Sequence, residues 1–407
     1  MKRLAIIGCG LRSDCYMHHL RDGLGTEWEV VALADPSPVA IEVYKENWNA
    51  ESAEVFVNGP KLLAAMKGKI DAAIIGSPNS LHTESIIPAL EQDLIIMLEK
   101  PVVTTIEDCQ KVWQAAQKSK SRIAVGFVLR YTTFYRKVKE IVESGKIGDV
   151  LSINATEQLA APLTSMYTRQ WRRFDELAGS FILEKCSHDT DILNMLAGTP
   201  EKVSSFASRT HFNPKPEAAM HCKDCKIRED CRYDVARLEP YLMNVDRREE
   251  IERLIPSDND LCVFNAEKDV PDHQNVTIQY ENGIQATFSA IMDQPRTTRT
   301  ISIFGTTGQV IGDIGKDDLK IRYHIPSESG KYKEEQVSID HDGSGHHGGD
   351  SVITEQFIAM LRDQDTPPLA GLKEGLEAGM IAMAAEQSRH NNKIVDMTKL
   401  LKSVFTK

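Results

Sequence analysis

The chain has 407 residues, of which 41% are apolar and 26% charged, a balance typical of a globular protein with about two domains. Its net charge of −11 argues against nucleic acid or an anionic membrane as a partner. No apolar run approaches the roughly 20 residues of a membrane helix, and the apolar start breaks at Gly8, too early for a signal peptide. Because its eight cysteines come without a secretory signal, we expect a cytoplasmic protein with reduced thiols.

The first part of the chain alternates short apolar runs with helix-length segments of 3.6-residue periodicity. This alternation is typical of a parallel sheet that helices cover on both faces. The predicted strands are residues 3–7, 29–34, 72–75, 94–98 and 123–125, and the predicted helices include 11–20, 84–91 and 106–117. We therefore predict an α/β domain over residues 1–126, with the doubly wound parallel sheet of a Rossmann fold.

A glycine turn follows the first predicted strand. Gly8 permits a tight turn, and Gly10 lets the backbone approach a pyrophosphate where the next helix begins, at Leu11. Asp35 ends the second predicted strand, where its carboxylate would accept hydrogen bonds from a ribose and repel a 2′-phosphate. These residues favour NAD over NADP, although Arg12 could partly offset the repulsion, and the alternative is an ordinary strand–helix turn.

Polar side chains also follow the next two predicted strands. Ser77, Asn79 and His82 follow the third strand, and Glu99 and Lys100 follow the fourth. Ligands of doubly wound sheets bind at the carboxyl ends of the strands, so these groups could line a ribose or the nicotinamide. A buried lysine there would lie beside the reacting carbon. The alternatives are helix capping near Asn79 and a solvated charge at Lys100.

After residue 126 the pattern changes to longer strands in which apolar and polar residues alternate, as in a sheet with one buried face. The predicted strands are 150–156, 203–209, 275–280, 284–291, 298–304, 309–313 and 319–323, and the predicted helices include 134–143, 350–361 and 371–390. Residues 280–284 read as a hairpin turn. We predict a substrate domain of α+β class over residues 127–407, with a mostly antiparallel open sheet.

Glu184, His188 and Asp191 form a second group of candidate residues. Their i, i+4, i+7 spacing places all three on one face of a helix. The two acids could orient the imidazole and hold its pKa in the working range of a catalyst. A packed or capping histidine is the alternative.

Several of these motifs occur in an order that identifies a family. They are the glycine turn, Asp35, residues 77–82, Glu99-Lys100-Pro101, and Gly179 with Glu184, His188 and Asp191. The chain thereby resembles the Gfo/Idh/MocA oxidoreductases. The resemblance rests on specific motifs up to about residue 205 and on the pattern of the fold beyond it. The resemblance implies a Rossmann domain, a carboxyl-terminal sheet domain that often forms dimers or tetramers, NAD or NADP, and a sugar, cyclitol or related substrate.

The resemblance also implies roles for single residues. Lys100 would be the catalytic lysine, His188 matches the family's histidine, and Glu184 stands where the family usually has an aspartate. The polar groups after the third and fourth strands match cofactor-facing positions.

The chemistry that these residues support is hydride transfer between a carbinol carbon and nicotinamide. The hydroxyl proton must pass to a base within hydrogen-bond reach, and a lysine is a poor base at neutral pH unless its pKa is lowered. We expect His188 to be the base, Lys100 to polarise the same oxygen and Glu184 to bind a neighbouring hydroxyl. Two alternatives stay open: a redox-neutral glycosidase or epimerase with tightly bound NAD, and a non-enzymatic regulator that senses NAD or a sugar.

A charged, cysteine-rich insertion is predicted at about residues 210–262. Cys222, Cys225 and Cys231 have C-x2-C-x5-C spacing, and a C-x2-C turn can hold one metal ion. The candidates for a fourth ligand are His211, His221 and Cys262. A structural zinc ion is therefore a hypothesis, beside the alternative of free thiols on a polar loop.

Three more residues are candidate substrate contacts. Arg130 and Trp171 could line the sugar pocket, and His347 could reach the substrate from a Gly/His-rich loop at 341–349. Loop flexibility and helix capping by Asp350 are the alternative for that loop.

Overall fold

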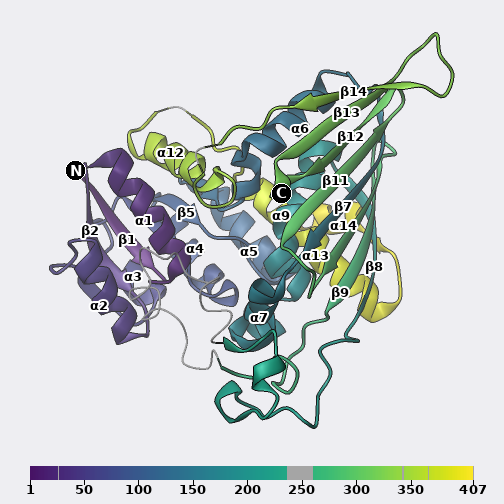
Figure 1. The fold of residues 1–407 in the computed structure, drawn as a ribbon. Coiled ribbons are helices and arrows are strands. Elements are labelled where there is room, and N and C mark those ends of the chain that lie inside the picture. The colour runs from purple at the N-terminus through teal and green to yellow at the C-terminus, as the bar shows by residue number, and fades with distance from the viewer. Residues whose placement is uncertain (26, 236–259, 342, 365, 407) are drawn as a thin grey trace.

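The first sheet is built from six short apolar strands. They are β1 (Lys2–Ile7), β2 (Trp28–Ala34), β3 (Glu54–Phe56), β4 (Ala72–Ile75), β5 (Ile95–Leu98) and β6 (Arg122–Val125). In the computed structural model all six are parallel, in the order β3-β2-β1-β4-β5-β6 (Figure 1). Leu4 and Ile6 of β1 join one apolar cluster, and Ala5 and Ile7 join the other. Both faces are thus buried, which explains the unbroken apolar runs and confirms the predicted Rossmann arrangement.

Helices cover both faces of this sheet. They are α1 (Leu11–Leu24), α2 (Pro38–Asn47), α3 (Gly59–Ala65), α4 (His82–Leu90), which follows η1 (Asn79–Leu81), and α5 (Ile106–Ala116). A further helix, α12 (Gly349–Leu361), comes from far along the chain and packs against α1 (Figure 1). Ile353 and Phe357 of α12 lie in the same buried cluster as Tyr16 of α1. The segment predicted for the second domain therefore returns one helix to the first sheet.

The second sheet is larger and mixed. Its strands are β7 (Val150–Gln158), β8 (Pro200–Ser208), β9 (His273–Tyr280), β10 (Gln285–Ile291), β11 (Thr298–Gly305), β12 (Gly308–Asp313), β13 (Asp318–His324), β14 (Tyr332–Val337) and β15 (Val395–Asp396). The order is β14-β13-β12-β11-β7-β10-β9-β8-β15, and β7 and β10 form a parallel pair in an otherwise antiparallel sheet. The hairpin predicted at residues 280–284 joins β9 to β10. The predicted fold class is confirmed.

One face of the second sheet is covered and the other is open (Figure 1). The helices of this half are α6 (Thr133–Glu143), α7 (Ala161–Arg169), α8 (Asp175–Ala178), α9 (Phe181–Ala197), α13 (Leu372–Asn391) and α14 (Met397–Phe405). The short 3-10 turns are η2 (Val128–Tyr131), η3 (Trp171–Arg173), η4 (Cys222–Asp224), η5 (Arg228–Asp230) and η7 (Ile314–Lys316). α13 packs against both α9 and β8, and α9 also contacts β7 and β10 of the sheet. Most side chains of α9 are therefore buried.

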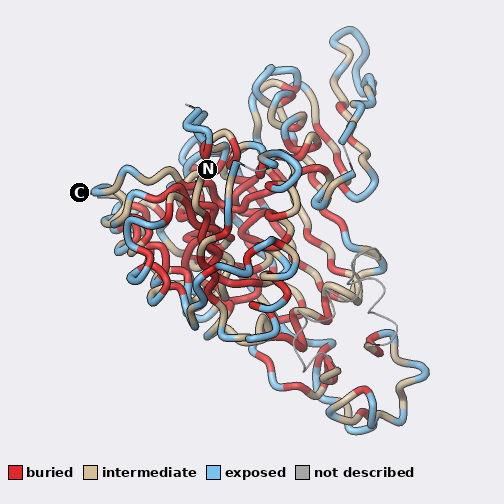
Figure 2. The backbone as a smooth tube through the Cα atoms, turned by 90° about the vertical axis from the view of Figure 1, so that its left-hand side faces the viewer, coloured by how far each residue is buried: buried red, intermediate tan, exposed pale blue. Residues whose placement is uncertain are grey.

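The structure describes residues 1–25, 27–235, 260–341, 343–364 and 366–406. Residues 236–259 of the predicted insertion lie outside the described residues. Its described part forms a lobe beyond the end of the second sheet, with more exposed and half-buried backbone than the two sheets (Figure 2). No helix in the described part of the chain has both the length and the apolar character needed to cross a lipid bilayer.

Candidate active site

The turn after β1 has the shape of a phosphate cradle. Gly8 has a φ of +90°, and a Cβ there would lie 2.5 Å from the backbone of Gly76, so only glycine fits without strain. A Cβ at Gly10 would meet no described atom within 4 Å, which leaves the backbone open on that side. The 14-residue helix α1 begins at Leu11 without a side-chain cap, so the first N–H groups of the helix are available to an anion.

Asp35 lies at the carboxyl end of β2, next to this turn. Its Oδ2 accepts a hydrogen bond from the Cys9 N–H at 2.9 Å, and its Oδ1 accepts one from the Ser37 N–H at 2.8 Å. These bonds fix the carboxylate beside the glycine turn, where an adenosine ribose would bind. Together the open turn, the uncapped helix and the fixed carboxylate fit a bound dinucleotide.

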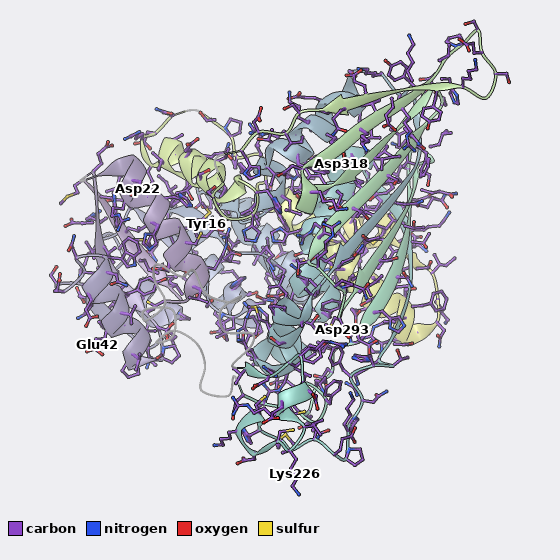
Figure 3. The ribbon with its side chains drawn as sticks, in the orientation of Figure 1. Tyr16, Asp22, Glu42, Lys226, Asp293 and Asp318 are labelled. Carbon is purple, nitrogen blue, oxygen red and sulfur yellow. The ribbon has the colours of Figure 1, made fainter. Side chains whose placement is uncertain are left out.

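Arg12 does not face Asp35. Its Nε lies 2.7 Å from Glu99 Oε1, its Nη1 lies 2.7 Å from Asp350 Oδ1, and its Nη2 donates to the Tyr16 hydroxyl at 3.0 Å. Figure 3 shows Tyr16 on the side of α1 that faces the second sheet, and its hydroxyl also donates to Glu99. The side chain of Arg12 is therefore engaged in an ion-pair cluster, and its expected offset of the charge of Asp35 has no geometric support.

The polar residues after β4 mainly hold the local backbone. The buried ring of His82 has one nitrogen 2.8 Å from the Ser77 carbonyl oxygen and the other 2.8 Å from that of Pro101, and burial lowers its pKa. The Asn79 amide donates to the Ala178 carbonyl at 2.9 Å, which ties the first sheet to α8. The Ser77 hydroxyl has no hydrogen-bond partner among the described residues. His82 and Asn79 thus fix the loop, and a cofactor contact by their side chains stays a prediction.

Lys100 follows β5 and is largely buried, with its side chain 13% exposed. Its ammonium group donates to the backbone carbonyl of Glu184 and lies 3.8 Å from the Glu184 Oε1 atom. Burial lowers the pKa of Lys100, while the charges of Glu184 and Glu99 oppose that shift. The lysine thus reaches α9 from the end of the first sheet, as a ligand-facing group in this fold should.

Both oxygens of the Glu184 carboxylate accept hydrogen bonds from protein groups. Its Oε1 accepts from Arg172 Nε at 2.8 Å, and its Oε2 accepts from the Tyr167 hydroxyl at 2.5 Å. Burial alone would raise the pKa of Glu184, but the charges of Lys100 and Arg172 and the bond from Tyr167 lower it to about 2. This geometry favours a role in holding Lys100 over the expected bond to a substrate hydroxyl. Arg172 and Tyr167 were not singled out from the sequence.

His188 is buried on α9, with its ring 5.8 Å from the Phe127 ring. Burial, followed by the charge of Lys100, lowers the pKa of His188 well below its usual value, so the imidazole is neutral near pH 7. The prediction that Glu184 and Asp191 orient this ring is wrong for the described residues. Its Nδ1 has no hydrogen-bond partner there, and Asp191 instead accepts two bonds of 2.7 Å from Arg130. All three residues lie on α9, and Arg130 of η2 is the group that pairs with Asp191.

The Gly/His-rich loop presents a different histidine from the expected one. The His346 ring lies 6.3 Å from the His188 ring, and its Nδ1 lies 3.0 Å from Asp350 Oδ2. Burial lowers the pKa of His346, with Asp350 opposing the shift. His347 instead turns toward Asp317, with Nδ1 3.9 Å from Oδ1. Because His346 and His347 both have positive φ, at 50° and 54°, the alternation of an extended chain does not apply.

The other expected substrate contacts are engaged with protein groups. Beyond its bonds to Asp191, Arg130 donates to the Leu369 carbonyl at 2.9 Å. The Arg172 guanidinium stacks on the Trp171 ring at 4.5 Å, which places Trp171 one contact away from Glu184. Substrate binding by Arg130 and Trp171 stays a prediction.

The zinc hypothesis gains no support from the geometry. Cys222, Cys225, Cys231 and Cys262 line one small cavity in the insertion, together with Arg169. Among the described residues, however, they are not a group whose ligand atoms gather closely enough for one ion. His221 is paired with Asp260 at 2.8 Å, and His211 lies 3.1 Å from Asp293 Oδ2. All four cysteines are free thiols.

The fold and the site define a nucleotide-binding oxidoreductase, and the comparisons agree. Residues 2–127 match the oxidoreductase family with an NAD-binding Rossmann fold, and residues 135–311 match the GFO/IDH/MocA C-terminal domain. The chain belongs to the GFO/IDH/MocA family of NAD-binding oxidoreductases, as the sequence motifs predict.

Three similar proteins illustrate the family. The chain is 26% identical over 406 residues to YteT of Bacillus subtilis, named as an oxidoreductase, and covers 93% of each chain. It is 29% identical over 157 residues to inositol 2-dehydrogenase of Ralstonia nicotianae, covering 38% of this chain and 45% of that one. Levoglucosan dehydrogenase in complex with NADH superposes with a TM-score of 0.73 at 19% identity, over 97% of this chain and 98% of that one, which shows a shared fold.

Proposed function

We propose that this protein is an NAD-dependent dehydrogenase that moves a hydride between nicotinamide and a CH–OH carbon of a sugar, cyclitol or related polyol. The observation that carries the proposal is the buried ammonium group of Lys100, held against Glu184 where the first sheet meets α9 and near the neutral ring of His188. Two similar proteins, inositol 2-dehydrogenase and levoglucosan dehydrogenase, are named after a polyol and a sugar derivative.

The cofactor would be held by the glycine turn and by Asp35. The backbone at Gly8, Gly10, Leu11 and Arg12 would bind the pyrophosphate, and the Asp35 carboxylate would accept from the ribose. Because the guanidinium of Arg12 is bound to Glu99 and Asp350, it would not offset the repulsion that Asp35 exerts on a 2′-phosphate. NAD is therefore favoured over NADP. When bound, NAD supplies the hydride acceptor.

The residues of the chain would manage the proton. Lys100 would donate to the reacting hydroxyl oxygen and stabilise the developing negative charge there, and His188, being neutral, would accept the hydroxyl proton. Glu184 would hold Lys100 in place, because its own oxygens already accept from Arg172 and Tyr167. His346, on the loop facing His188, would bind the substrate in place of His347.

We further propose that residues 1–126 form the cofactor domain and residues 127–407 the substrate domain of a cytoplasmic dimer or tetramer. The open face of the second sheet would be the contact surface between copies. Phe206 of β8 is 76% exposed and Leu151 of β7 is 55% exposed, and a contact between copies across this face would cover both side chains. A molar mass from light scattering tests this assignment.

The test of the activity is NADH formation by purified protein with NAD and a panel of inositols, free sugars and aryl glycosides. Net NADH with one class names that class. Released aglycone or an isomerised sugar without NADH would favour the redox-neutral glycosidase or epimerase. If no product forms with any compound, the non-enzymatic sensor is favoured. We expect Lys100→Met to lower turnover by at least about 10³-fold while NAD binds within about threefold of normal. The control is Lys118→Met at an exposed lysine, and near-normal turnover of Lys100→Met would contradict the assignment.

A further inference from the structure

A cluster of two histidines and one aspartate lies outside the residues assigned above. Asp317 follows η7 at the turn into β13, while His341 and His347 belong to the loop between β14 and α12. One ligand atom from each of the three residues can be chosen so that all lie within 4.8 Å of one another. Among the described residues this is the one group of His, Cys, Asp or Glu with that property.

The distances suit a transition-metal ion. His341 Nε2 lies 3.3 Å from Asp317 Oδ2, and His347 Nδ1 lies 3.9 Å from Asp317 Oδ1. Metal–ligand bonds of about 2.0–2.1 Å in a tetrahedron separate neighbouring ligand atoms by roughly 3.3 Å, so small rotations would bring the three atoms onto one ion. Two imidazoles and one carboxylate are ligands that zinc and its neighbours in the transition series accept.

Asp317 carries a second observation that points to a ligand. The Asp317 side chain is 40% exposed, but its Oδ1 atom is covered by protein and has no hydrogen-bond partner among the described residues, with His347 Nδ1 3.9 Å away. A cation bound between the two atoms would give this oxygen a partner. The His341 and His347 rings meet edge to face, with their centroids 5.9 Å apart. The two imidazoles thus lie side by side next to the Asp317 carboxylate.

We propose that Asp317, His341 and His347 bind one divalent transition-metal ion, for which Zn²⁺ is the natural probe. The next residue, Asp318, is the first of β13 and is labelled in Figure 3. Because both histidines precede α12, the ion would tie the loop before α12 to the turn that begins β13. Since His347 directly follows His346, the same ion would fix the backbone that carries His346.

One local bond has to change when the ion binds. The Gly343 N–H donates to His341 Nδ1 at 3.0 Å, so His341 carries its proton on Nε2, the atom nearest Asp317. Binding through Nε2 moves that proton to Nδ1, which can then no longer accept from Gly343. We therefore expect the turn at Gly343 to reorient when the metal binds, while the loop as a whole becomes better protected.

The experiment is a Zn²⁺ titration of chelator-treated, desalted full-length protein, followed by calorimetry. We expect one equivalent to bind with a Kd in the micromolar range or tighter, and His341→Asn and Asp317→Asn each to weaken that event at least about tenfold. His324→Asn, at an exposed histidine at the far end of β13, is the control and should bind like the wild type. No binding event, or one that His341→Asn and Asp317→Asn leave unchanged, overturns the proposal.

A second measurement separates this site from the cysteine cavity and does not depend on enzyme activity. Co²⁺ held by nitrogen and oxygen ligands gives visible absorption bands without thiolate charge-transfer absorption. We expect that spectrum from the wild type, and its loss in His347→Asn while a thermal melt shows the variant folded. A thiolate spectrum that disappears in Cys222→Ser would place the ion at the cysteines and overturn the proposal. Hydrogen exchange should slow across the peptide that spans the loop when Zn²⁺ is present.

Discussion

Replacing Glu184 with glutamine tests the electrostatics of the site. The amide has the shape of the protonated acid, so the pKa of Glu184 reports the free energy that separates the two forms in the folded protein. That pKa is lowered to about 2 from an ordinary 4.5, a shift worth about 3 kcal/mol. We expect Glu184→Gln to lower the free energy of unfolding by about 3 kcal/mol at pH 7.

The same argument fixes how this loss depends on pH. A lowered folded-state pKa gives stability that is fully present above the unfolded value near 4.5 and is lost as the pH falls toward 2. The difference between wild type and Glu184→Gln should therefore shrink from about 3 kcal/mol at pH 7 to about half of that at pH 3. Urea unfolding followed by fluorescence at both pH values measures it, with Glu91→Gln at an exposed acid as the control.

The substitution also acts on Lys100. The charge of Glu184 raises the pKa of Lys100 against the effect of burial, so its removal lets the pKa of the lysine fall. In an active preparation, the limb of the pH–rate profile that reports Lys100 should move to lower pH. An equal loss of stability at pH 7 and pH 3, or no loss at either, would refute the pairing of Glu184 with Lys100 and Arg172.

Two further predictions concern other acids. Asp35→Ser should weaken NAD binding by roughly 10- to 100-fold, because a charged hydrogen bond is lost, and should weaken NADP binding less. Asp35→Asn keeps one acceptor oxygen, so its loss of NAD affinity should lie between those of the wild type and Asp35→Ser. Equal losses for NAD and NADP would contradict the ribose assignment. Burial, with Glu386 and Asp269 nearby, raises the pKa of Asp175 to about 6. The stability that the protonated Asp175 contributes is fully present below pH 4 and is lost as the pH rises through 6, because the buried carboxyl group then becomes charged. Asparagine carries no charge at any pH. Asp175→Asn should therefore stabilise the protein by about 1 kcal/mol at pH 7.5 and by almost nothing at pH 4. A stabilisation of equal size at both pH values in thermal or urea unfolding would show that another cause dominates.

The sequence predicts the first sheet well because its strands are buried on both faces. Predicted residues 72–75 coincide with β4, and the other four predicted strands of that sheet lie within two residues of those observed at each end. β3 was missed because it has three residues and no fully buried side chain. β14 was missed because four of its six residues are exposed and three are charged, so its sequence carries no alternation of apolar and polar residues. The helix α14 was also missed, because the last predicted helix was that at residues 371–390.

The candidate site could be predicted only as far as residues lie on strand ends and helix faces. Lys100 and His188 follow from such positions, and the structure brings their elements together. The partners of Glu184 come from α7 and η3, two short elements without a periodic signal, so Tyr167 and Arg172 were missed. The exchange of His347 for His346 depends on two successive left-handed residues, which no spacing rule indicates.

The return of α12 to the first sheet has a consequence for the synthesis of the chain. β6 closes the first sheet at Val125, but more than 200 residues separate it from the end of α12. At about 5–20 residues per second, a ribosome needs roughly 10 to 50 seconds to deliver that helix. Throughout this interval Tyr16, Met17 and Leu20 of α1 lack the cover that Ile353 and Phe357 later provide. The nascent amino-terminal half therefore exposes apolar surface that a chaperone can bind, and its folding is completed only when most of the protein has been made.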